Sequence, residues 1–140
     1  MNRWPAIKSI KDLKVYELAY RLALDVLRLT KSYPKEETYS LVDQLRRSSR
    51  SVASNIREGY AKRRYEQVFI RHLTDALGSS EETRTWLEFS RDAGYISTEE
   101  YDRIDQSYDE LSAMLYRLID VWHRIDDPLM SDLRPQTSDL

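Results

Sequence analysis

Residues 44–64, QLRRSSRSVASNIREGYAKRR, carry seven arginine or lysine residues and one acidic residue. On a helix with about 100° per residue, Arg46, Arg50 and Arg57 fall within about 40° of one another. Arg64 continues this arginine row if the helix lasts that far. Guanidinium groups pair with phosphate oxygens and remain charged at any relevant pH. The spacing therefore predicts a surface that binds the phosphates of a nucleic acid.

The same stretch offers further basic and aromatic side chains. The predicted nucleic-acid-binding residues are Arg46, Arg47, Arg50, Arg57, Lys62, Arg63 and Arg64. Tyr60 and Tyr65 lie close by in sequence and could stack on exposed bases, which suits single-stranded RNA. The alternative is a solvated face whose arginines pair with acidic residues of the next helix, namely Glu81, Glu82 or Glu88.

Charge is distributed unevenly along a chain whose net charge is only −2. Residues 44–72 contain eight basic and two acidic residues, whereas residues 75–110 contain eleven acidic and three basic ones. Either one side faces a polyanion, or two neighbouring helices attract each other. The acidic side supports a competing hypothesis, a module that binds a basic protein partner. That side is defined by Glu81, Glu82, Asp102 and Asp109.

Catalytic chemistry has little support in the sequence. Arg117 and His123 have a six-residue spacing that occurs in some small helical ribonucleases, where His acts as a base and Arg stabilises the phosphorane. In a continuous helix these side chains lie about 120° apart, so this ribonuclease is the least favoured alternative. Asp120 and His123 do not form the paired motifs of metal-binding bundles. We expect no catalytic residue, no metal and no cofactor.

The elements that position these residues are four helices. The chain has 140 residues and no proline between Lys35 and Asp127, and its apolar residues recur at three- and four-residue steps. The predicted helices run from 11 to 31, from 36–38 to 59–61, from 64 to 92 and from 97 to 125. An all-α, up-down-up-down four-helix bundle over 10–126 is expected, with an N-terminal arm (1–9) and a flexible C-terminal tail (127–140).

Local signals mark helix ends and close helix contacts. Ser97 and Glu100 form a capping box, and Gly94 has the position of a C-cap glycine. Gly59 and the small residues 78–80 are expected to let neighbouring helices approach closely. Asn55 is expected to be partly buried and hydrogen-bonded, which would fix one packing register. A structural role is likewise expected for Ser48.

The composition also bears on location. The chain has no cysteine, so disulfides and thiolate sites are excluded. The N-terminal residues MNRWPAIKSIKD lack the apolar run of a signal peptide, and no segment approaches the length of a membrane span. A cytoplasmic protein without a membrane partner is expected.

Several segments together resemble a known family. They are IKDLKVYELAYRLA, SSRSVASNIREG, ALGSSEE and DAGYIS, in this order and spacing between Ile10 and Trp122. The chain resembles the 23S ribosomal RNA intervening-sequence proteins, which are small bacterial four-helix bundles. The motif positions that carry over are Ser51, Asn55, Ile56, Glu58, Gly59 and the run Ala76-Leu77-Gly78-Ser79. Arg57 departs from the small alanine usual there and adds to the arginine row.

This resemblance implies an all-α bundle that assembles as a ring, typically a homopentamer. It also implies an association with RNA, because members are encoded within ribosomal RNA genes. Related bundles act as accessory factors that bind nucleic acid and a reverse transcriptase. For most members the molecular function is not established, and no catalytic residue carries over. The combined expectation is a non-enzymatic, oligomeric accessory or scaffold protein that binds RNA or another nucleic acid.

Overall fold

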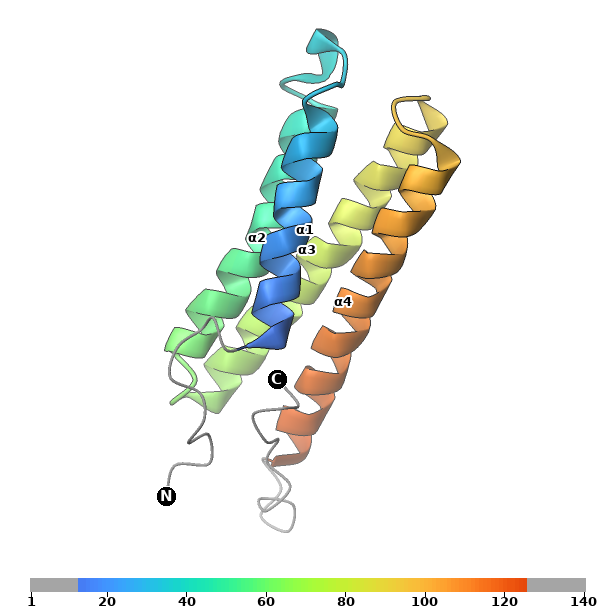
Figure 1. The fold of residues 1–140 in the computed structure, drawn as a ribbon. Coiled ribbons are helices and arrows are strands. Elements are labelled where there is room, and N and C mark those ends of the chain that lie inside the picture. The colour runs from blue at the N-terminus through green and yellow to red at the C-terminus, as the bar shows by residue number, and fades with distance from the viewer. Residues whose placement is uncertain (1–12, 126–140) are drawn as a thin grey trace.

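The computed structural model describes residues 13–125, which form a bundle of four helices (Figure 1). The helices are α1 (Lys14–Thr30), α2 (Leu41–Ala61), α3 (Glu66–Asp92) and α4 (Thr98–Ile125), and a short 3-10 helix, η2 (Lys35–Glu37), follows α1. Successive helices run in opposite directions, so the predicted up-down-up-down bundle is confirmed. The predicted arm (1–9) and tail (127–140) lie outside the described residues.

The apolar stripes of the four helices meet in one core. Helix α2 packs most extensively against α3, while α1 packs mainly against α2 and more sparsely against α4. Phe69 of α3 meets Trp122 of α4 edge-on, with ring centroids 5.0 Å apart, and both side chains are buried. Phe89 of α3, in contrast, is 58% exposed. One face of α3 therefore presents an aromatic residue to solvent.

The predicted start of the second helix at 36–38 is wrong. Residues Lys35–Glu37 form only the single 3-10 turn η2, and the α-helix begins at Leu41. The Ser40 hydroxyl donates to Glu37 Oε1 at 2.6 Å and does not cap the helix. Tyr39 is 94% exposed, so this segment has little apolar surface to hold a helical turn against the core.

The predicted helix ends around α3 and α4 are confirmed. Gly94 adopts φ 78°, and the amides of Gly94 and Tyr95 donate to the carbonyls of Arg91 and Ser90. This is the Schellman pattern, which only a left-handed residue completes without strain. At α4 the Glu100 amide donates to Ser97 Oγ at 3.1 Å, as a capping box requires.

The basic segment after α2 is a turn, as predicted. Helix α2 ends at Ala61, and the Lys62 amide closes its last turn by donating to the carbonyls of Glu58 and Gly59. Because the helix stops there, Arg64 does not continue the arginine row. Of the helices that the structure describes, none combines the length and hydrophobicity needed to span a membrane.

Candidate nucleic-acid interface

The arginine row lies beside α1 on the outer face of α2. Arg46 is half-buried, and its Nε donates to Thr30 Oγ1 at 2.9 Å. Arg57 is exposed, and its Nη1 lies 3.4 Å from the hydroxyl of Tyr16. Arg50 lies between them and is exposed. Helix α1 therefore forms the second wall of the predicted basic surface.

A groove runs between α1 and α2 along this row. It is lined by Tyr16, Tyr20, Ala23, Leu24, Leu27, Arg50, Ala53, Ser54 and Arg57. A second hollow adjoins it at Tyr16, Tyr20 and Arg57 and also includes Glu17. We call this continuous feature the α1–α2 groove. It joins cationic, aromatic and aliphatic side chains on one exposed face.

The contribution of α1 was missed in the sequence analysis. Tyr16 and Tyr20 are one turn apart, with ring centroids separated by 6.1 Å. Tyr20 is 53% exposed and Leu24 is 36% exposed, although both are large and apolar in part. The signal was a second apolar stripe, displaced from the core stripe of α1 by part of a turn.

The other basic residues that were predicted to bind nucleic acid either face solvent or contact a neighbouring side chain. Arg47 pairs with Asp43 at 2.9 Å, and Lys62 lies 3.6 Å from a Glu58 carboxylate oxygen. Arg63 covers the ring of Tyr60, with its guanidinium carbon 3.9 Å from the ring centroid. These contacts leave Arg47, Lys62 and Arg63 less free to bind phosphate.

Among the described residues, Arg50 and Arg64 form no ion pair. The row also makes no ion pair with Glu81, Glu82 or Glu88 within that part of the chain, because it faces α1 and not α3. The salt-bridged alternative in that form is therefore wrong. Of the two predicted stacking rings, Tyr60 is half-buried and Tyr65 is 63% exposed.

The motif residues of α2 form a polar chain along the contact with α3. The Asn55 amide nitrogen donates to the Ser51 carbonyl at 3.0 Å, and Ser51 Oγ lies 2.9 Å from Ser79 Oγ. His72 Nδ1 lies 3.3 Å from Asn55 Oδ1 and 3.4 Å from Glu58 Oε2. Both of these oxygens can accept a hydrogen bond from Nδ1. Asn55 is thus half-buried and hydrogen-bonded, as expected.

Two other positions of the α2 motif, Ile56 and Gly59, lie in the packed interior of the bundle. Ile56 is fully buried. At Gly59 an added Cβ would stand 2.7 Å from His72 Cβ, so α2 and α3 meet closely there, as predicted. Ser48 is also buried, and its hydroxyl lies 2.8 Å from that of Thr83. Gly78, in contrast, is exposed and an added Cβ would have no neighbour within 4 Å. The expected close contact at Gly78 is absent within the described residues.

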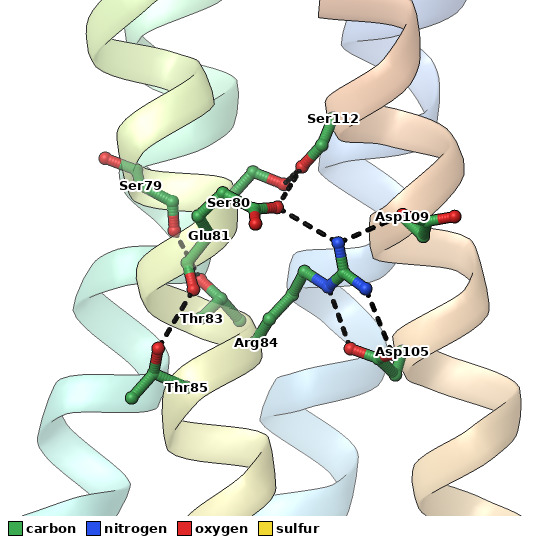
Figure 2. A network of polar contacts seen from close by, with 9 residues as sticks. All are labelled: Ser79, Ser80, Glu81, Thr83, Arg84, Thr85, Asp105, Asp109 and Ser112. Carbon is green, nitrogen blue, oxygen red and sulfur yellow. Dashed lines mark hydrogen bonds and ion pairs between the residues drawn. The ribbon is translucent and has the colours of Figure 1, made fainter.

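The acidic side is partly neutralised by Arg84, which reaches from α3 to α4 (Figure 2). Its guanidinium donates to both carboxylate oxygens of Asp105 at 2.9 and 3.2 Å, and to Asp109 at 3.1 Å and Glu81 at 3.2 Å. The hydrogen bonds to Asp105 above all raise the pKa of Arg84. The Ser112 hydroxyl donates to the same Glu81 oxygen that meets Arg84, at 2.7 Å. Two of the four residues predicted to bind a partner, Glu81 and Asp109, are thus engaged in joining α3 to α4.

The helix that would carry a ribonuclease site continues without interruption to Ile125. Arg117 is exposed, and the backbone keeps it six residues and about 120° from position 123. The side chain of His123 lies outside the described residues. Within the described residues no group of three or more His, Asp or Glu side chains could hold a metal ion.

The comparisons with known proteins define the family. A model of the 23S rRNA-intervening sequence proteins matches residues 11–117, and the chain belongs to this family. A similar solved structure is that of a protein of unknown function from the S23 ribosomal protein family of Bacteroides thetaiotaomicron VPI-5482. It is 29% identical, with a TM-score of 0.69, over 75% of this chain and 97% of the other. A search of curated proteins returned no match.

Proposed function

We propose that this protein is an oligomeric helical-bundle scaffold that binds RNA through the α1–α2 face. The observation that carries the proposal is the placement of Arg50 and Arg57, exposed two helical turns apart on one face of α2. Their guanidinium groups border a groove that also holds exposed tyrosine and aliphatic surface. This combination suits a phosphate backbone whose bases also touch protein.

The basic surface of a single protomer is small, since Arg46, Arg47, Lys62 and Arg63 already contact other groups of the chain. Assembly would overcome this weakness. In a homo-oligomer, with the homopentamer suggested by family resemblance, each copy would add Arg50 and Arg57 to one continuous surface. Binding by several weak patches at once raises affinity well beyond that of one patch.

The proposed role is non-enzymatic. Its support is the continuity of α4, whose backbone keeps positions 117 and 123 about 120° apart around the helix axis. The protein would then act by holding RNA, and any chemistry on that RNA would belong to a partner.

A pair of charge reversals tests the proposal. Replacing Arg50 and Arg57 together with Glu should abolish retention of a short RNA at moderate salt, because phosphate would then meet repulsion. The same double reversal at Arg103 and Arg117, both exposed on α4, is the matched control and should reduce binding only slightly. Circular dichroism and sedimentation should show unchanged helicity and size for both variants.

The outcomes separate the competing explanations. If both double variants lose binding equally, the affinity reflects overall charge and not the α1–α2 face. If the Arg50/Arg57 variant binds like the wild type, the proposal is wrong. A protein partner retained after nuclease treatment, and lost when Glu82 and Asp102 are replaced, would instead favour the acidic side.

A further inference from the structure

We propose that the α1–α2 groove seats an unstacked base of single-stranded RNA and therefore distinguishes single strands from duplexes. This inference rests on the proposed function and specifies the nucleic acid that the same face accepts. It assigns base contacts to α1 and phosphate contacts to α2.

The groove has the composition of a stacking site. Tyr16, Tyr20, Ala23, Leu24 and Leu27 fall within about 100° of one another on one face of α1. On α2 the facing positions Ala53 and Ser54 are small, which leaves room in front of the rings. Tyr20 is 53% exposed, and among the described residues no guanidinium group stacks on its ring.

The two arginines flank this hollow. Arg50 and Arg57 are seven residues apart, a rise of about 10 Å along the helix. A strand laid along α2 can therefore place phosphates at both arginines while a base between them turns toward α1. The charge complementarity favours a nucleic acid over a second apolar helix, since a helix seated there would have to bury both guanidinium groups.

Glu17 limits where the base can sit. Its exposed carboxylate lies on the α1 side of the hollow that includes Arg57, so it disfavours a nucleotide inside that hollow, while a phosphate on the α2 side can still meet Arg57. Among the described residues that line the groove segment next to Arg50, none is acidic. The seat is therefore the segment formed by Tyr20, Leu24 and Ala53, toward Arg50.

A duplex cannot use such a seat. In double-stranded RNA the bases are stacked inside the helix and present only edges and phosphates, whereas a single strand can splay a base onto an aromatic ring. Stacking on tyrosine also tolerates any base, so the groove should select for strandedness and not for sequence.

The test compares a short labelled RNA without self-complementarity with a duplex of the same sequence, each titrated by fluorescence anisotropy over a series of salt concentrations. Tyr20→Ala should weaken single-strand binding about tenfold, leave duplex binding unchanged and leave the salt dependence unchanged, because it removes stacking and no charge. Arg50→Ala should weaken binding of both RNAs and lower the single-strand slope of log K against log salt by about 0.7 for each copy that contacts the strand. Tyr116→Ala, an equally drastic change at a 68% exposed tyrosine of α4, is the control and should change nothing.

The results distinguish this inference from the proposed function. If Tyr20→Ala has no effect, or weakens both RNAs equally, the base seat is wrong although the basic face can still bind phosphates. If Tyr20→Ala changes the sedimenting size, a second copy covers the groove and the inference is overturned. Failure of the wild type to bind either RNA at low salt would defeat the proposed function as well.

Discussion

Gly59 and Gly78 occupy helical positions with opposite surroundings. Gly59→Ala would place a Cβ 2.7 Å from His72 Cβ and 3.1 Å from a ring carbon of Phe69. We expect the free energy of unfolding to fall by about 1–3 kcal/mol, because neither α3 residue can move without disturbing the core. In Gly78→Ala the added Cβ has no neighbour within 4 Å. This substitution should raise the free energy of unfolding by about 0.5–1 kcal/mol, because alanine has a higher helix propensity than glycine.

Urea denaturation at one protein concentration measures both glycine variants, and each serves as the control for the other. A Gly59→Ala protein as stable as the wild type would contradict the close approach of α2 and α3. Destabilisation by Gly78→Ala, with a change in sedimenting size, would mean that another copy of the chain packs at position 78.

Tyr108 gives a prediction that depends on pH. Its ring is fully buried and its hydroxyl has no hydrogen-bond partner among the described residues. Burial, and secondarily the charge of Asp25, raise the pKa of Tyr108. The folded state therefore retains a proton that the unfolded state loses above pH about 10, so stability decreases as the pH rises beyond that value.

Tyr108→Phe should remove this contribution. At pH 7 the variant should be as stable as the wild type or more stable by up to about 1 kcal/mol, since no hydrogen bond is lost. Above pH 10 its stability should decline less steeply than that of the wild type in denaturant titrations. Tyr39→Phe, at a 94% exposed position, provides the comparison. A strongly destabilised Tyr108→Phe protein would reveal a hydroxyl partner such as a buried water.

At the scale of single residues, the sequence identified which residues are basic and which belong to the α2 motif, but it did not identify their neighbours. The i,i+4 pair of Arg47 and Asp43 is local and was open to prediction from spacing. The contacts of Arg46 with Thr30 and of Arg57 with Tyr16 join residues 16 and 41 positions apart. They depend on how α1 and α2 pack, which one-dimensional spacing does not specify.

At the scale of elements, Arg84 joins α3 to α4. Arg84→Met should destabilise the protein by about 1–3 kcal/mol, because Asp105, with 20% of its side chain exposed, would lose its bidentate partner. Adding Asp105→Leu to Arg84→Met should recover most of this loss, since the orphaned charge is removed. Chemical denaturation of the two single variants and the double variant completes the cycle.

Asp43→Ala is the control for the Arg84 and Asp105 variants. It breaks an exposed ion pair with Arg47 and should alter the free energy of unfolding by less than about 0.5 kcal/mol. Strictly additive effects of Arg84→Met and Asp105→Leu would contradict the coupling between α3 and α4.

Local capping chemistry made the helix ends near Gly94 and Ser97 predictable. The start of α2 was not, since Glu36 and Glu37 favour a helix that the exposed Tyr39 segment does not continue.

At the scale of the whole molecule, the two charged regions of the sequence differ in how they use their charge. On the acidic side, Arg84 binds three carboxylates, two of which were assigned to partner binding. On the basic side, Arg50 and Arg57 remain exposed along the α1–α2 groove. The bundle topology was predictable from helix number and short connections. The groove was not, because it exists only where the second stripe of α1 meets the row on α2.

The most direct measurement of the central claim is the affinity of the wild-type protein for single-stranded RNA over a salt series, with its sedimenting size determined in the same buffers. We predict a linear fall of log K with log salt, with a slope of about −3 or steeper, which corresponds to about four or more neutralised phosphates. Such a slope would exceed the two phosphate contacts that Arg50 and Arg57 of one protomer can make, and it would support several copies acting together. No binding at low salt by a folded, assembled protein would contradict the account and direct attention to protein partners.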